Sequence, residues 1–168
     1  MATSAGEKQT FLDTYDREHA ITMKVLRAYP TDRLELRPHE KCRTAKELGW
    51  VFVVERGLGE MVFNDEFPEK AGGEMPKPPT EWPDVLSALE ESTARFREMV
   101  ADTPPEDLDV KVRFFTAPKT MGEMSRIDWL WFLLHDEIHH RGQFSIYLRM
   151  ADARVPSIYG PTADEQWM

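Results

Sequence analysis

Proline residues divide this chain into four blocks that each carry the apolar spacing of a helix. Pro30 ends the first block, which runs from about Lys8 to Ala28. Pro104 and Pro105 end the third block. A proline inside a helix removes a backbone donor and clashes with the preceding turn, so these positions must lie at helix ends or between helices. The placement of the prolines therefore predicts four helices joined by connectors.

The starts of the inner helices carry capping signals. Thr44 and Glu47 form the Thr-x-x-Glu pattern of a capping box ahead of an apolar run. Pro83 suits the first turn of a third helix, where a missing N–H costs nothing. The fourth helix is predicted to run from about Thr120 to Met150.

Two stretches between these blocks do not have a helical pattern. Residues 64–80 are rich in proline and glycine: Pro68, Gly72, Gly73, Pro76, Pro78 and Pro79. Residues 110–115 alternate like a strand, but no neighbouring segment is recognisable as a partner, so we interpret them as an extended crossover. The chain is therefore predicted to be an all-α, single-domain four-helix bundle over residues 1–168, with a long crossover connection and an irregular tail from about residue 152.

Composition narrows the classes of function. The chain has 168 residues, a hydrophobic fraction of 41% and a formal net charge of −9, which argues against a nucleic-acid partner because phosphate binding needs basic surface. No run approaches the roughly 20 apolar residues that cross a membrane, and the first residues lack the apolar run of a signal peptide. The single cysteine, Cys42, excludes an intramolecular disulfide, and we predict a cytoplasmic location.

The last helix combines apolar and ionisable residues. On a wheel of about 100° per residue, one side is formed by Trp129, Phe132, Leu133, Phe144, Tyr147 and Met150. Asp136, His140 and Gln143 fall within the same arc and are predicted to face the bundle interior. The charged residues predicted to face away are Glu137, Arg141 and Arg149.

Asp136 and His140 are the first candidate site residues. Their i, i+4 spacing stacks the two side chains about 6 Å apart on one face, which suits two ligands of one metal ion. A buried Asp–His ion pair without metal is the alternative. His139, at the edge of the arc, is a further candidate ligand, and a shifted register would pair His135 with His139.

A second apolar patch lies on the opposite side of the same helix. It consists of Leu130, Trp131, Leu134 and Ile138. A helix that is apolar nearly all round needs to be buried on two sides. The patch is either a contact within the bundle or the interface of a homodimer.

The sequence HHRGQFSIYLR, residues 139–149, resembles a signature of the DinB/YfiT-like superfamily. The tail residues 155–161 and the end of the first helix at residues 26–30 are also similar to that family. The resemblance implies a four-helix bundle, often dimeric, with a divalent metal on three histidines, one from helix two and two from helix four. It also implies relatives that are thiol-dependent transferases, an isomerase and hydrolases.

The family's ligand pattern is only partly present in this chain. His140 matches one histidine, Asp136 stands where the family has a second, and the helix-two ligand aligns near Val51. Aspartate can ligate zinc, nickel or manganese, whereas valine cannot. Glu55 lies one turn after Val51 and is a candidate substitute, the alternative being an acid that pairs with an arginine.

Two classes of function follow. The first is a divalent-metal-dependent hydrolase or thiol transferase that uses Asp136 and His140, with His139 or Glu55 completing the shell, and a small-molecule substrate such as a low-molecular-weight thiol. The second is a metal-free bundle, either a small-molecule binder or a structural homodimer. In the binder, the pocket would be lined by aromatic residues: Trp50, Trp129, Phe132 and Tyr147.

Overall fold

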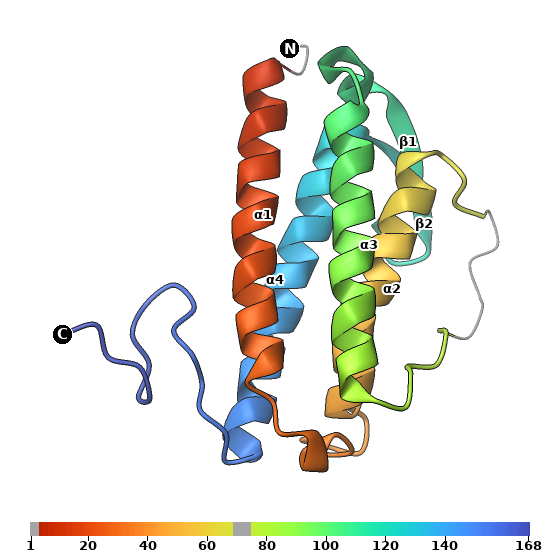
Figure 1. Ribbon diagram of the computed structural model, residues 1–168. Helices are drawn as coiled ribbons and strands as arrows, with labels where there is room; N and C mark the ends of the chain where they lie inside the picture. The colour runs from red at the N-terminus through yellow and green to blue at the C-terminus, as the bar shows by residue number, and fades with distance from the viewer. Residues whose placement is uncertain (1–3, 69–74) are drawn as a thin grey trace.

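Figure 1 shows a computed structural model of the chain, in which residues 4–68 and 75–168 are described. The described residues form four long helices and one pair of strands. The helices are α1 (Ala5–Arg27), α2 (Ala45–Phe63), α3 (Trp82–Asp102) and α4 (Arg126–Met150). The strands are β1 (Lys111–Ala117) and β2 (Thr120–Ser125).

The bundle has an up-down-down-up arrangement. In Figure 1, α1 and α4 run one way, and α2 and α3 run the other. Each of α1 and α2 packs against both α3 and α4. Because α2 and α3 are parallel, the connection between them spans the length of the bundle, whereas residues 110–115, which were predicted to be an extended crossover, lead into strand β1 of a hairpin. Part of the connection between α2 and α3, including Gly72 and Gly73, lies outside the described residues.

The predicted starts of α2 and α3 are confirmed. Thr44 Oγ1 accepts from the Glu47 amide at 3.1 Å, and a Glu47 carboxylate oxygen accepts from the Thr44 amide at 2.7 Å, which completes the capping box. Pro83 lies in the first turn of α3. These local contacts satisfy amide groups that a helix start leaves free.

The prediction for residues 110–125 was wrong. Residues 120–125 are not the first turn of the last helix but strand β2, which pairs antiparallel with β1. Lys119, with φ 60, closes the turn between the strands. The last helix begins only after Ser125, whose hydroxyl accepts from the Asp128 amide at 3.2 Å. The all-α prediction therefore holds for the bundle and misses this hairpin.

The buried face of α4 also differs from the prediction. Its buried residues include Leu130, Leu134, Glu137, Arg141, Phe144 and Leu148. Glu137 and Arg141 are 0% and 1% exposed, whereas Phe132, predicted to be inside, is 46% exposed. The core residues follow alternating steps of four and three, and on a wheel of about 100° per residue Glu137 and Arg141 fall between Phe144 and Leu134, inside the buried arc. The predicted arc lay too far toward Phe132 and Met150, which are exposed, and therefore excluded both charges.

The charges buried on α4 are paired across the bundle. Glu137 forms an ion pair with Arg56 of α2 and accepts from Thr22 of α1 at 2.8 Å. Arg141 donates to Glu18 of α1 at 2.7 Å. Unpaired charges in these places would be strongly destabilising, so the pairs hold α1, α2 and α4 in one relative position.

The second apolar patch of α4 packs inside the chain. Leu130 and Leu134 belong to the core, and Trp131 meets the Phe11 ring edge-on at 5.3 Å between centroids. The prediction that this patch is a contact within the bundle is confirmed. No helix among residues 4–68 and 75–168 is long and apolar enough to cross a membrane.

Gly59 marks a close approach between helices, and this gives a first prediction. A Cβ at Gly59 would lie 2.6 Å from Leu133 Cδ2 and 2.8 Å from Phe96 Cε2. We expect Gly59→Ala to lower the free energy of unfolding by about 1–3 kcal/mol through overpacking. At Gly57, where nothing lies within 4 Å of the added atom, alanine should stabilise α2 by about 1 kcal/mol. Urea denaturation measures the free energy of unfolding of both variants. Equal changes in Gly59→Ala and Gly57→Ala would contradict the close packing at Gly59.

The Arg56–Glu137 pair gives a second prediction. We expect Glu137→Gln to lower the free energy of unfolding by about 3–5 kcal/mol, because Arg56 is left as an uncompensated buried charge. The control is Asp16→Asn, which breaks the exposed pair with Arg97 and should cost less than about 1 kcal/mol. Similar losses in both variants would show that burial of the first pair has no energetic consequence.

Candidate metal centre

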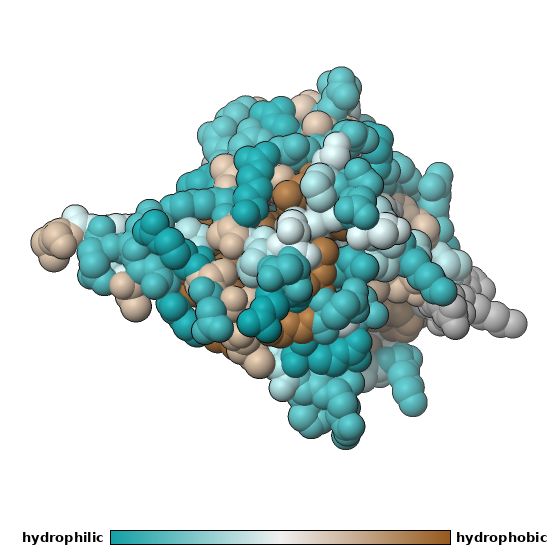
Figure 2. Space-filling model, turned by 60° about the horizontal axis from the view of Figure 1, so that its bottom comes forward, coloured by the Kyte–Doolittle hydropathy of each residue, from teal (hydrophilic) through white to brown (hydrophobic). Residues whose placement is uncertain are grey.

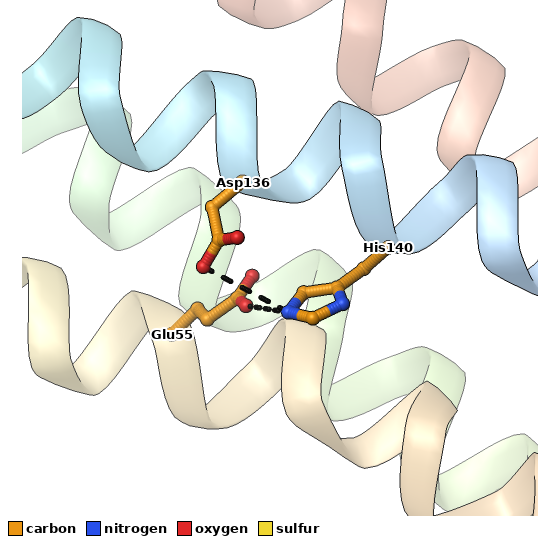
Figure 3. Close-up of side chains that lie close together, drawn as sticks. All are labelled: Glu55, Asp136 and His140. Atoms are coloured by element: carbon orange, nitrogen blue, oxygen red, sulfur yellow. Dashed lines mark ion pairs between the residues drawn. The ribbon is translucent and has the colours of Figure 1, made fainter. Parts of the chain in front are cut away.

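Three ionisable side chains from two helices meet on one side of the α2–α4 contact. Glu55 comes from α2, and Asp136 and His140 come from successive turns of α4 (Figure 3). His140 Nε2 lies 2.9 Å from Glu55 Oε1 and 3.7 Å from Asp136 Oδ2. One ligand atom from each residue lies within 4.8 Å of the others.

The buried ion pair beside this cluster positions it. Arg56 follows Glu55 directly in α2, and Glu137 follows Asp136 directly in α4. Because Arg56 and Glu137 are joined in the core, the residues that precede them are brought to the same level of the two helices. The packing of Phe52 edge-on to the His140 ring, at 6.3 Å between centroids, supports the imidazole from the other side.

The two carboxylates of the cluster lie in different environments, one buried and one open to solvent. Glu55 is 5% exposed, and its Oε2 is buried without a hydrogen-bond partner among the described residues. Burial raises the pKa of the Glu55 carboxyl. The hydrogen bond with Glu55 raises the pKa of the His140 imidazole. The Asp136 side chain is 43% exposed and opens the cluster toward solvent.

Gln143 orients the imidazole from behind. Its Oε1 lies 3.2 Å from His140 Nδ1, and its Nε2 lies 2.9 Å from His139 Nε2. The Gln143 amide oxygen accepts a hydrogen bond from Nδ1–H, so Nε2 faces Glu55 and Asp136, as a donor when the imidazole is protonated and as a possible metal ligand when it is neutral. His139 thus contacts the residue that orients His140 and stays outside the cluster itself.

Three of the four candidate ligands are brought together. Asp136 and His140 meet as their spacing predicts, and Glu55 joins them and pairs with His140 rather than with an arginine. His139 and His135 are both exposed, so the alternative register places its histidines on the outer surface. Glu55 thus supplies the acid from α2, one turn from the valine at position 51.

The predicted aromatic pocket does not form. Trp129 is fully buried in the core, and its indole N–H donates to the Gly59 carbonyl at 3.2 Å. Phe132 lies against the hairpin near Phe114. The Trp50 indole donates to the Pro76 carbonyl. Trp129 and Phe132 stack at 5.6 Å between centroids, whereas Tyr147 donates to the Arg43 carbonyl, so the four residues do not line one pocket.

The sequence analysis did not identify the buried charged residues that position the cluster. Arg56 was not singled out, and Glu137 and Arg141 were placed on the solvent side. The signal that identifies the last two is the strict alternation of steps of four and three from Leu130 to Leu148, which passes through both charges. Arg56 has no comparable signal, since a Glu-Arg pair in a helix is ordinary surface sequence.

The donor set fits a divalent cation. Tetrahedral sites with metal–ligand distances of about 2.0–2.2 Å place neighbouring ligand atoms about 3.3 Å apart, close to the 2.9 and 3.7 Å found around His140 Nε2. Two carboxylates and a neutral imidazole together balance two positive charges. The unpartnered Glu55 Oε2 is a buried acceptor that a cation would satisfy.

Solved structures show the same fold. A DinB-like protein from Bacillus cereus ATCC 10987 superposes with a TM-score of 0.76 at 21% identity, over 95% of this chain and 100% of that chain. The DinB-like protein YjoA from Bacillus subtilis gives 0.66 at 16% identity, over 89% and 97%. A conserved protein from Enterococcus faecalis gives 0.63 at 17% identity, over 85% and 95%.

Sequence comparison agrees with these structural matches. The chain is 25% identical to the uncharacterized protein YrdA of Bacillus subtilis strain 168 over 158 residues, which is 94% of this chain and 90% of that protein. The sequence model of the DinB superfamily matches residues 14–144, from the middle of α1 through most of α4 and including all three residues of the cluster. The chain therefore belongs to the DinB superfamily.

Proposed function

We propose that this protein is a divalent-metal-dependent enzyme whose metal centre is formed by Glu55, Asp136 and His140. The observation that carries the proposal is the convergence of these three ligand atoms within 4.8 Å, around a glutamate that is almost fully buried. An isolated buried carboxylate is costly. A cation compensates it more fully than the single contact with His140, because that contact leaves Oε2 without a partner.

The donor set indicates which ions suit the centre. Imidazole and carboxylate donors are both compatible with zinc, nickel and manganese, and a second carboxylate favours harder ions relative to an all-histidine site. A divalent cation held there would supply a Lewis acid that lowers the pKa of a coordinated water or thiol. We therefore propose a reaction of the hydrolase or thiol-transferase type on a small molecule.

The chain's own residues have distinct roles in this proposal. Glu55 supplies a carboxylate whose pKa is raised by burial, and His140 is held in place by Gln143 and Phe52. Asp136 lies at the open side of the cluster, where a substrate can reach it. The homodimer expected from the family resemblance stays a prediction that sedimentation velocity would test.

Metal binding is tested by titrating chelator-treated protein with Zn²⁺, Ni²⁺ and Mn²⁺ in a calorimeter. We expect binding of one ion per chain. Loss of a residue that only hydrogen-bonds to a metal ligand already costs about 10–100-fold in affinity, so removal of a ligand itself in Glu55→Gln or His140→Ala should cost at least about a hundredfold.

The matched control for that experiment is His135→Ala. His135 is exposed on the neighbouring face of α4, so its variant should bind as the unchanged protein does. Absence of binding in the unchanged protein would contradict the proposal. Loss of binding in His135→Ala with retention in His140→Ala would instead favour the register of His135 and His139.

The pH dependence of stability gives a further prediction. The pKa values of Glu55 and His140 are both raised in the folded chain. Their contribution to metal-free stability is therefore present at low pH and lost as the pH rises through these values. A cation reverses this trend because it binds only deprotonated ligands.

We expect the increase in Tm on adding Zn²⁺ to grow from about pH 6 to about pH 8, across the range in which an imidazole loses its proton. Thermal unfolding with and without chelator measures this increase. In His140→Ala the increase should be small at every pH. A zinc effect that is independent of pH in the unchanged protein would contradict His140 as a ligand.

A further inference from the structure

A pocket of about 360 Å³ opens one turn along α4 from the metal centre. Its walls come from α2, α4 and the connector between α1 and α2, and its lining is Pro38, Lys41, Cys42, Arg43, Leu48, Gln143, Ile146 and Tyr147. Ile146 is 57% exposed and contributes apolar surface to the pocket. Figure 2 brings this end of the bundle forward and shows apolar surface between hydrophilic side chains.

The rim of this pocket is cationic in an acidic protein. The connector carries Lys41 and Arg43 on the pocket wall, and neither has an ion pair within residues 4–68 and 75–168. Glu47 feels the charge of Arg43, but its carboxylate is already engaged by the Thr44 amide. With a net charge of −9 over the whole chain, free cations beside apolar walls favour a small organic anion.

The connector that carries these cations is held in place. The Tyr147 hydroxyl donates to the Arg43 carbonyl at 2.8 Å, and the Cys42 amide donates to the His39 carbonyl at 2.9 Å. Both contacts use backbone atoms of the connector. The Lys41 and Arg43 side chains can therefore be changed without removing the contacts that shape the pocket.

Gln143 joins the pocket to the metal centre. It lines the pocket, and its Oε1 lies 3.2 Å from His140 Nδ1. Along α2, Leu48 of the pocket and Glu55 of the cluster are separated by two turns, with Phe52 between them in contact with the His140 ring. A molecule that fills the pocket therefore contacts Gln143, which is the residue between the pocket and the imidazole.

We propose that this pocket binds the substrate, and that the substrate is a small organic anion. Its anionic group pairs with Lys41 and Arg43, its apolar body lies on Leu48, Ile146 and Tyr147, and its other end reaches the centre past Gln143. The proposal that this anion is the substrate rests on the proposed function. The proposal that the pocket binds an anion does not depend on it.

Cys42, the single cysteine, lies on the wall and serves as a built-in reporter. Its thiolate is allowed to react with one of two aromatic disulfides, the anionic dithiobis(nitrobenzoate) or the neutral dithiodipyridine. In each reaction the Cys42 sulfur forms a mixed disulfide and one aromatic thiolate leaves. The ratio of the two rate constants cancels any effect of neighbouring charge on the thiol itself.

We expect Lys41→Gln/Arg43→Gln to lower the ratio of the anionic to the neutral rate on the order of tenfold at low ionic strength, and added salt to lower it in the unchanged protein. The control is Lys111→Gln/Lys119→Gln, which removes the same charge from the hairpin and should leave the ratio unchanged. Phenylacetate, an apolar body with one carboxylate, should slow the neutral reagent, and its cationic counterpart phenethylamine should not.

A ratio that is the same in Lys41→Gln/Arg43→Gln as in the unchanged protein would overturn the proposal. Equal protection by phenylacetate and phenethylamine would do the same. The rates are measured in chelator and again with Zn²⁺. If Cys42 reacts faster with the anionic reagent in a charge-dependent way but the protein does not bind zinc, the anion pocket is supported and the proposed function is contradicted. If the protein binds zinc but the reaction of Cys42 does not depend on charge, the anion pocket is contradicted and the proposed metal centre is supported.

Discussion

The ion pair between Arg56 and Glu137 is the contact on which the rest of the structure depends. Both side chains are completely buried, so neither charge is tolerable unless the other lies opposite it. This requirement sets α2 and α4 at one axial position, and Thr22 and Arg141 extend the network to α1. Leucine packing alone would tolerate a shift of one helix along the other, whereas a paired buried charge does not.

The cluster of Glu55, Asp136 and His140 is a consequence of that arrangement. Glu55 and Asp136 precede the paired residues in their helices, so the contact that buries Arg56 and Glu137 also brings their neighbours to one place on the flank of the bundle. The family resemblance implies a site of three histidines, and here two carboxylates and His140 converge. Such a donor set carries two more negative charges than three neutral imidazoles and would weaken the Lewis acidity of the ion it holds.

Local signals along the chain predicted the helices well and the hairpin poorly. A capping box, a proline in the first turn and prolines beyond helix ends act over a few residues, and all have the expected effect at Thr44, Pro83 and Pro30. Strand pairing has no such local signal. Residues 120–125 contain one glycine and one glutamate and resemble a helix start, and only their hydrogen bonds with β1 make them a strand.

The sequence by itself determined the number of helices, the starts of α2 and α3, and the membership of Asp136 and His140 in one face of α4, because each depends on residues close together in the chain. Tertiary structure decided how the charges on the buried face of α4 are tolerated and what joins that pair. The alternating steps of four and three pass through Glu137 and Arg141, but their burial is favourable only because Arg56 and Glu18 come from other helices. Glu55 was already a ligand candidate in the sequence because it lies one turn after Val51, but only the packing of α2 against α4 places it beside His140 rather than beside an arginine.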